Sequence, residues 1–378
     1  MKEKRNKGPK VVIGGYYGYG SIGDEAMLSA IISQIEKTAP DTRVFVINRD
    51  RYLEKRTGPL IPVAIARRDV FSLLYDLLTA DIFVFGGGSL LQDSTSSKSL
   101  FYYKTLLRLA ALLGCRIYIY ANGIGPLSQK KKLRGILEKA ERISLREKAS
   151  FDECRRILKS EGEGLFLSAD PVFLDYPPKV KERPLSCLRS LGGRRYFAVS
   201  LRECRGERQV DLLCVAAAVN RIRAEGAIPV FVPMQREYDL EICRKAAHLT
   251  EGAVADCRNM EDVLHLVSGA EFCIGMRLHF LLAAVMAGVA CVALSYDCKV
   301  RSTMEYLGVF GTLDAFSFSE NDLYYAVFAA RHCTDREKLS ERSRQMSDLA
   351  REDISLLLEM IAEKNEEKKE ERAEQVSG

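Results

Sequence analysis

The clearest hydrophobic pattern in the chain lies between Ala270 and Lys299, with the sequence AEFCIGMRLHFLLAAVMAGVACVALSYDCK. Two apolar runs, Glu271–Ile274 and Ala290–Ser295, predict short buried strands. The apolar segment Leu278–Ala287 between them predicts a helix. This order of strand, helix and strand is typical of a parallel sheet.

The run from Phe280 to Tyr296 carries no charge and approaches the length of a membrane span. Gly288, however, stands where a helix would end, and β-branched residues follow it. We therefore expect a buried βαβ unit and no transmembrane span.

Similar alternation of strands, glycine turns and helices fills the rest of the chain, which predicts doubly wound parallel sheets of the α/β class. The expected strands are Lys10–Gly14, Arg43–Asn48, Ala80–Phe85, Arg116–Tyr120, Tyr196–Leu201 and Ile228–Pro233, with a further short strand in ERISLREKAS that ends near Arg146. The expected helices are Asp24–Lys37, Leu100–Leu113, Lys130–Ala140, Val210–Ala224, Asp239–Leu249, Met260–Val267, Asn321–His332 and Arg336–Ile361.

A stretch rich in proline, glycine and charge separates two α/β series, so we expect two domains. The expected division is a basic tail at 1–9, a first Rossmann-like domain at 10–178, a linker at 179–195, a second Rossmann-like domain at 196–345, and a C-terminal helix with a charged tail at 346–378. Little in the last 16 residues can be buried, which favours a fraying, solvated end. Two such halves would enclose a cleft, a usual place for small-molecule sites.

Polar residues stand at the two ends of the βαβ unit. Arg277 and His279 follow its first strand and Lys299 follows its second, so the three can converge at the carboxyl edge of a parallel sheet. An Arg and a Lys beside a helix N-terminus suit a phosphate or a carboxylate. A solvated Arg277 and a core His279 fit the spacing equally well.

Near the N-terminus, Gly18, Gly20 and Gly23 satisfy the dinucleotide fingerprint G-x-G-x-x-G. Asp24 and Glu25 follow directly and place two negative charges where a pyrophosphate would have to bind. The sequence therefore argues against NAD binding.

The composition sets further bounds. A net charge of +5 is too mild and too dispersed to indicate nucleic-acid binding, and it leaves peripheral contact with an anionic membrane surface open. The eleven cysteines are scattered without a CxxC pair, which predicts neither disulfides nor zinc and favours a cytoplasmic protein. We expect no cofactor and no metal, and the sequence leaves the oligomeric state undetermined.

Taken together, several motifs resemble the polysaccharide pyruvyl transferases of the CsaB type. They are GYYGYGSIGDEAML, FGGGSLLQD, ANGIGPL, SLRE, ADPVF and GMRLHFLLAA with the Tyr-Asp-Cys-Lys that follows. The resemblance covers about residues 10 to 350. It implies a GT-B-like fold and transfer of the enolpyruvyl group of phosphoenolpyruvate onto a sugar as a ketal. The implied acceptor is an N-acetylmannosamine residue of a lipid-linked cell-wall polymer precursor at the inner face of the plasma membrane, a polymer type that anchors S-layers.

Under this resemblance, cations at predicted strand ends and helix starts suit the two anionic groups of phosphoenolpyruvate. The expected donor-binding residues are Arg277, Lys299, Arg202, Arg146 and Leu278, and the expected acceptor-binding residues are Gly20, Asp24, Gly87, Gly88 and Asn122. His279 is the one histidine in a cationic cluster, so it is the expected general acid or base. Asp24 is the second expected catalytic residue, although helix capping explains it as well.

Three other functions remain open at this point. A GT-B glycosyltransferase would bind a nucleotide sugar in the second domain, and a non-catalytic protein would bind an anionic sugar phosphate without turnover. An NAD oxidoreductase is the weakest alternative because of Asp24. Fold alone would not decide between them.

Overall fold

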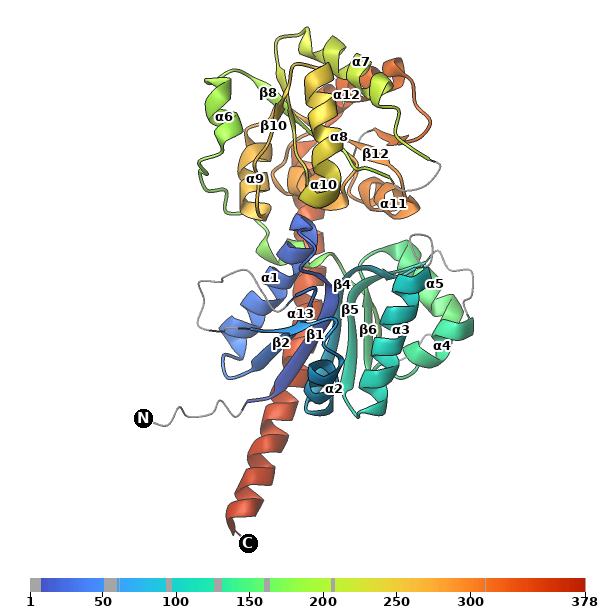
Figure 1. Cartoon of the computed structure of the whole chain (residues 1–378), viewed down its shortest axis with the longest axis vertical. Coiled ribbons are helices and arrows are strands. Elements are labelled where there is room, and N and C mark those ends of the chain that lie inside the picture. Colours follow the sequence, from blue (N-terminus) through green and yellow to red (C-terminus); the bar gives the residue numbers. More distant parts are fainter. Residues whose placement is uncertain are drawn as a thin grey trace. The chain divides into compact units, whose positions relative to one another are not determined.

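The computed structural model describes residues 8–50, 60, 62–92, 97–125, 131–159, 164–204, 208–309 and 311–377. The chain forms two compact α/β units (Figure 1). Unit 1 contains the chain up to Tyr19, Met27–Leu174 and the chain from Asp348, and unit 2 contains Gly20–Ala26 and Asp175–Ser347. Most of the expected basic tail, residues 1–7, lies outside the described residues.

Unit 1 is built on a parallel sheet with the strand order β3-β2-β1-β4-β5-β6-β7. Its strands are β1 (Lys10–Tyr17), β2 (Arg43–Asn48), β3 (Val63–Ala66), β4 (Ile82–Leu91), β5 (Arg116–Ile124), β6 (Arg142–Leu145) and β7 (Leu165–Leu167). Its helices are α1 (Ile22–Thr38), α2 (Val70–Leu78), α3 (Ser97–Leu112), α4 (Lys131–Leu137) and α5 (Lys148–Leu158), followed by a 3₁₀ turn at Pro171–Asp175.

Strand β5 shows how the sequence builds the layers of unit 1. Ile117 and Ile119 pack into the apolar cluster that contains Leu106 of α3. The alternate residue Tyr118 points to the opposite face, because side chains alternate along a strand, and its hydroxyl donates to Asp353 of α13 (Arg336–Ser377). Helices α3 and α13 therefore cover opposite faces of this sheet (Figure 1).

The expected C-terminal tail is mostly exposed, as predicted, but it does not fray, because α13 continues to Ser377. Glutamate, lysine and arginine are good helix formers, and the tail is rich in them. Ion pairs also fasten the helix to unit 1: Lys368 binds Asp81 at 2.6 Å and Arg116 binds Glu363 at 2.7 Å. The sequence of this segment has no apolar face, so the ion pairs of its charged side chains with unit 1 could not be predicted from it.

Unit 2 is built on a second parallel sheet with the order β10-β9-β8-β11-β12-β13. Its strands are β8 (Tyr196–Ser200), β9 (Ile228–Phe231), β10 (Ala253–Val254), β11 (Cys273–Gly275), β12 (Cys291–Ser295) and β13 (Thr312–Asp314). Its helices are α6 (Ser186–Leu191), α7 (Leu212–Arg223), α8 (Arg236–Leu249), α9 (Met260–Ser268), α10 (Leu278–Met286), α11 (Cys298–Tyr306) and α12 (Glu320–Cys333).

The predicted βαβ unit is confirmed as β11, α10 and β12, with β11 and β12 paired in parallel. Residues Phe280–Met286 of α10 are all buried, which explains why this helix is apolar on every side. Within the described chain, no helix has the length and hydropathy to cross a bilayer.

The division into units differs from the expected domain limits in three places. Residues 20–26 pack in unit 2, residues from Asp348 pack in unit 1, and the expected linker contains α6. Composition identified the change between α/β series at about 175–195, but it carries no information on which distant segment a helix end contacts. The two parallel Rossmann-like sheets themselves are as predicted.

Candidate active site

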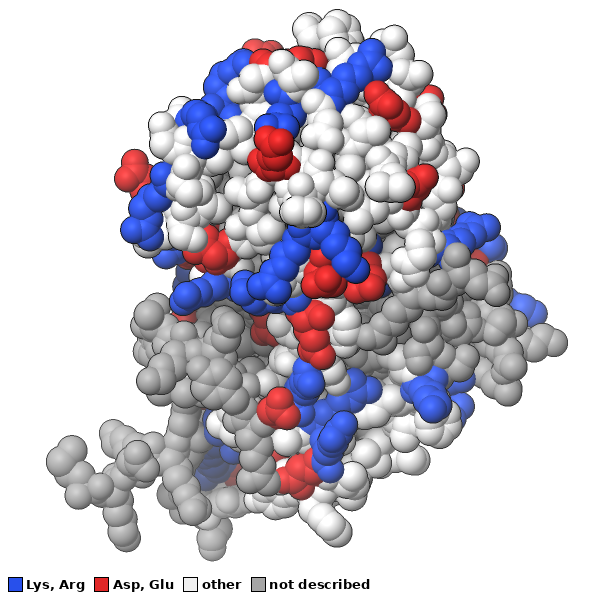
Figure 2. Space-filling model, turned by 45° about the horizontal axis from the view of Figure 1, so that its top comes forward, with Lys and Arg blue, Asp and Glu red and all other residues white. Residues whose placement is uncertain are grey.

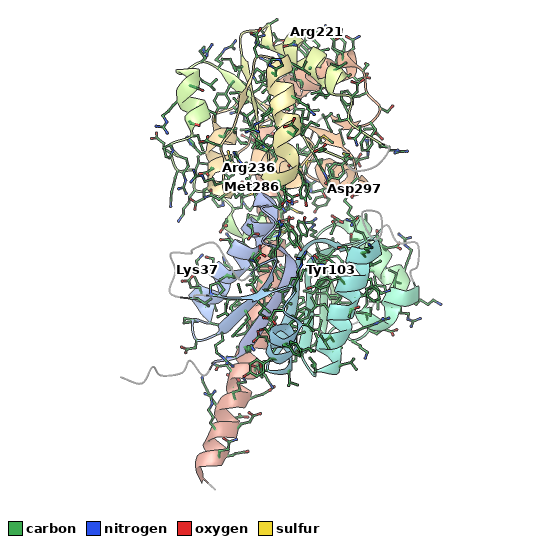
Figure 3. The ribbon with its side chains drawn as sticks, viewed as in Figure 1. Lys37, Tyr103, Arg221, Arg236, Met286 and Asp297 are labelled. Atoms are coloured by element: carbon green, nitrogen blue, oxygen red, sulfur yellow. The ribbon has the colours of Figure 1, made fainter. Side chains whose placement is uncertain are left out.

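Three neighbouring strands of unit 2 deliver the candidate site. Strands β8, β11 and β12 lie side by side and run parallel, so their carboxyl ends share one edge of the sheet. Arg202 follows β8, Arg277 follows β11, and Lys299 lies in the first turn of α11 after β12. Figure 3 labels Asp297, which begins this last turn. The edge brings together the cations that the sequence predicted for it.

Arg277 is held by a carboxylate from a neighbouring helix. Its Nε donates to Oδ2 of Asp239 at 2.9 Å and its Nη2 donates to Oδ1 at 2.6 Å. The Asp239 side chain is fully buried, whereas that of Arg277 is 16% exposed. Burial lowers the pKa of Arg277, but the neighbouring Asp239 more than offsets this, so the pKa is raised and the guanidinium is a permanent cation.

Gln235 completes this support. It ends the turn after β9, its amide oxygen accepts from Arg277 Nη2 at 3.3 Å, and its backbone N–H donates to Asp239 at 2.9 Å. The sequence analysis gave Gln235 and Asp239 no role. The available signal was an acidic residue in the first turn of a helix that follows a strand of the same sheet.

The other two cations have different surroundings. The guanidinium of Arg202 lies over the ring of Tyr296, 4.4 Å from the centroid. Lys299 is buried with 4% of its surface exposed, and its backbone N–H donates to Asp297, the N-cap of α11. A buried lysine at the carboxyl edge of a parallel sheet is a candidate contact for an anionic ligand. Leu278 begins α10 directly after Arg277 and is half-buried.

The first turn of α1 packs against His279. A Cβ atom on Gly23 would overlap the His279 imidazole ring, so the glycine lets helix backbone and imidazole touch. The Ile22 N–H donates to the Met234 carbonyl at 2.9 Å, and Ser21 forms an antiparallel bridge with Gln235. The third glycine of the fingerprint therefore makes room for a histidine.

Asp24 lies in this same turn. Its carboxylate accepts a hydrogen bond from the Ser21 hydroxyl, and it is one of the charges that raise the pKa of Arg277. Asp24, Arg277 and His279 thus belong to one part of unit 2. Gly20, at the start of the segment, is exposed with a positive φ of 66°.

Arg146, the remaining predicted donor residue, belongs to unit 1. Its guanidinium is buried, 2.6 Å from Asp170 and 3.8 Å from Glu147, and it donates to Ser89 at 3.2 Å. Two carboxylates beside it give Arg146 a structural role within unit 1. Its role in donor binding stays a prediction.

Gly87, Gly88 and Asn122, predicted to bind the acceptor, are buried in unit 1. Gly87 has a positive φ of 41°, and a Cβ there would lie 3.0 Å from the Met27 sulfur. Asn122 is fully buried and donates to the Phe85 carbonyl at 3.3 Å. Strand β4 runs through these glycines to Leu91, beyond the predicted end at Phe85. The described contacts give these residues packing roles, and acceptor binding by them stays a prediction.

Charged side chains of both signs are interspersed on the face shown in Figure 2. No three His, Cys, Asp or Glu side chains of the described chain are grouped in a way that could hold a metal ion. The cysteines whose side chains the structure describes are all free.

The sequence matches the family "Polysaccharide pyruvyl transferase" over residues 22–297. The chain belongs to the polysaccharide pyruvyl transferase family. The match includes Asp24, the Asp239–Arg277 pair and His279, and it stops just before Lys299. No curated protein matches the chain.

Solved structures with a similar fold include epimerases and glycosyltransferases. A UDP-N-acetylglucosamine 2-epimerase from Rickettsia bellii has a TM-score of 0.62 at 11% identity and covers 94% of this chain and 97% of its own. A UDP-forming trehalose-phosphate synthase from Burkholderia xenovorans has a TM-score of 0.59 at 11% identity, and the match covers 95% of this chain and 99% of the synthase. A glycosyltransferase from Rickettsia africae has a TM-score of 0.57 at 10% identity, and the match covers 96% of this chain and 98% of the glycosyltransferase. At such identities the likeness shows a GT-B-like fold and nothing about substrate.

Proposed function

We propose that this pyruvyl transferase moves the enolpyruvyl group of phosphoenolpyruvate onto two hydroxyls of a saccharide. The methylene carbon of the donor gains a proton and becomes a methyl group, and its C2–O bond to phosphate breaks. Two bonds form from C2 to sugar oxygens, giving a pyruvate ketal and free phosphate. One hydroxyl proton balances the new methyl group and the other leaves with the phosphate.

The observation that carries the proposal is the Asp239–Arg277 pair at the carboxyl edge of β11. Asp239 occupies the Nε and Nη2 edge of the guanidinium, and Arg277 Nη1 donates no hydrogen bond to any described residue. The pair therefore presents a fixed, charged donor group that an anion can use. Lys299 supplies a second cation after the adjacent strand, which suits a donor that carries both a phosphate and a carboxylate.

Proton transfer falls to His279 in this proposal. Its imidazole packs against Gly23, which fixes one side of the ring, and it follows Arg277 by two residues. A positioned imidazole can deliver the proton to the methylene carbon or remove one from a hydroxyl. Asp24 would accept a hydrogen bond or a proton from the acceptor and would stabilise positive charge at C2.

The acceptor in the proposal is an N-acetylmannosamine residue of a lipid-linked cell-wall polymer precursor. The support for it is the resemblance to the CsaB type. The lipid link would place the enzyme at the cytoplasmic face of the plasma membrane, in a pathway that provides attachment sites for S-layers. The reaction as written needs no cofactor.

A ligand screen by thermal unfolding tests the donor. A ligand that binds only the folded state raises the melting temperature. We expect phosphoenolpyruvate to raise it in the wild type and to lose this effect in Lys299→Met, whereas NAD, UDP and UDP-sugars leave it unchanged. Stabilisation by UDP or a UDP-sugar without stabilisation by phosphoenolpyruvate would instead establish the glycosyltransferase alternative.

A further inference from the structure

Three neighbouring strands of unit 1 deliver a second group of polar residues, separate from those discussed above. Tyr17, Asn48 and Ala66 end β1, β2 and β3 and lie in register across the sheet. The next residues along β2 and β3 are Arg49 and Arg67. Their backbone N–H groups donate to the Tyr17 and Asn48 carbonyls at 3.1 and 2.8 Å. The two arginines therefore leave the same carboxyl edge of the sheet from fixed starting points.

Arg67 is enclosed by tyrosines. Its guanidinium lies 3.6 Å from the ring centroid of Tyr102 and 5.6 Å from that of Tyr103, and its Nη1 donates to the Tyr19 hydroxyl at 2.8 Å. Figure 3 labels Tyr103 on α3. Burial lowers the pKa of Arg67, but Tyr103, Tyr102 and Tyr19 more than offset this and leave it raised.

A half-buried guanidinium usually has a carboxylate beside it, because a buried charge is costly unless it is paired. Arg146 and Arg277 both follow this rule. No carboxylate lies within ion-pair distance of Arg67 in the described parts of the chain. Aromatic rings and one hydroxyl hold the charge in place, and none of the described residues supplies it with an anion.

The tyrosines extend this surface toward Arg49. Tyr16 and Tyr19 stack with their ring centroids 4.3 Å apart, and the guanidinium of Arg49 lies 5.4 Å from the Tyr19 centroid. Tyr16 and Tyr19 are half-buried, and the Arg49 side chain is 44% exposed. A ligand can therefore reach this group, which we name the Arg67 cluster: Tyr16, Tyr19, Arg49, Arg67 and Tyr102.

We propose that the Arg67 cluster binds a phosphorylated saccharide, with the phosphate on Arg67 and Arg49 and the sugar against the tyrosines. Guanidinium groups bind phosphate with directed, charge-assisted hydrogen bonds. Tyrosine offers an apolar ring to the C–H face of a sugar and a hydroxyl to its polar edge. Two of the rings are stacked on each other and a third is covered by Arg67, which leaves ring edges for a sugar more readily than an open face for a nucleobase.

This inference rests on the proposed function, because it assigns the cluster to the acceptor of the pyruvyl transfer. It differs from the acceptor residues expected from the sequence, of which Gly87, Gly88 and Asn122 are buried in the sheet. Its new content is the place in unit 1 where the ester phosphate of such an acceptor binds.

Calorimetric titration of the full chain without phosphoenolpyruvate tests the cluster. The probes are N-acetylglucosamine 1-phosphate, free N-acetylglucosamine, inorganic phosphate and UMP. We expect the sugar phosphate to bind more tightly than each of the other three. Arg67→Gln should weaken its binding by about 10- to 100-fold, the usual effect of removing a charged hydrogen-bond donor. Arg67→Lys, which keeps the charge and loses the planar fork, should also weaken it and guards against misfolding of the first variant.

The matched control is Arg68→Gln, because Arg68 is the next residue and its side chain is exposed. It should bind the sugar phosphate as the wild type does. Equal binding by Arg67→Gln and the wild type would overturn the proposal, as would equal losses in the Arg67 and Arg68 variants. Preference for UMP or inorganic phosphate would overturn it too. Phosphoenolpyruvate binding, measured separately on each variant, should be unchanged. If the wild type did not bind phosphoenolpyruvate, the proposed function would fail, whereas the sugar-phosphate titrations would still test the Arg67 cluster.

Discussion

The fully buried carboxylate of Asp239 accepts two hydrogen bonds from Arg277, from Nε at 2.9 Å and from Nη2 at 2.6 Å. The pair fixes the guanidinium before any ligand arrives, and such preorganisation lowers the entropic cost of binding. It also couples the site to the stability of unit 2, because neither partner can be removed without leaving the other in the interior.

Replacing Arg277 by alanine should therefore destabilise the protein as well as weaken donor binding. The uncompensated Asp239 carboxylate should cost about 3–5 kcal/mol in the free energy of unfolding, measured by urea titration. The double variant Arg277→Met with Asp239→Leu should recover part of this loss and still fail to bind phosphoenolpyruvate. An Arg277→Ala protein with wild-type stability would show that the pair is not formed in solution.

His279→Ala should separate chemistry from binding. The imidazole is assigned to proton transfer, so turnover should fall by roughly 10²–10⁴ while the affinity for phosphoenolpyruvate stays nearly unchanged. Steady-state kinetics with a verified acceptor and a direct titration of the donor measure the two effects. Near-normal turnover in a folded variant would remove the acid–base assignment and leave His279 as a core histidine.

Gly23→Ala should displace the His279 side chain while leaving its chemical identity unchanged. The new methyl group would overlap the imidazole, and the ring must move or the helix turn must shift. Displacement by about 1 Å can cost roughly 10²-fold in turnover. Gly135→Ala in α4 is the matched control, because a Cβ there meets nothing within 4 Å. Activity lost equally in both variants would argue against the contact.

The buried carboxylate of Asp353 should make stability depend on pH. It accepts hydrogen bonds from the hydroxyls of Tyr118, Ser144 and Ser168, and burial raises its pKa to about 6. Because its pKa is higher in the folded state than in the unfolded chain, the folded state holds the proton more tightly. The free energy of unfolding should fall as pH rises from about 4 to about 6, by up to about 3 kcal/mol.

Chemical denaturation across that pH range measures this contribution. Asp353→Asn should remove it, whereas Asp348→Asn, an exposed aspartate on the same helix, should retain it. Identical pH profiles for Asp353→Asn and the wild type would contradict the assignment.

A chelator should leave the pyruvyl transfer unchanged. The proposed chemistry uses side chains alone, with cations from arginine and lysine in place of a divalent ion. Activity of purified protein before and after treatment with EDTA gives the answer. Loss of turnover that a divalent ion restores would require a metal in the mechanism.

Periodicity predicted most of the strands because buried parallel strands are continuous apolar runs, and β2 was predicted to the residue. It also predicted that Arg202, Arg277 and Lys299 follow strands of one sheet, and the three strands are neighbours that share a carboxyl edge. These are consequences of local pattern and sheet geometry, which a single sequence contains.

Contacts between distant segments could not be predicted in this way. Asp239 and Arg277 are 38 residues apart, and Gly23 meets a histidine of the opposite half of the chain. Nothing in a short window distinguishes a glycine that makes a turn from one that admits an imidazole. The end of β4 was misplaced for a related reason, because Gly87 continues the strand and makes room for Met27.

The exchange of segments between the units limits how this protein can be divided. A fragment ending at Leu174 would lack Asp353, the common acceptor of the hydroxyls of Tyr118, Ser144 and Ser168. One face of its sheet would also lose the helix that covers it. A fragment starting at Asp175 would lack the turn that packs on His279. Neither half is a self-sufficient module, and a single cut between them would leave two incomplete products.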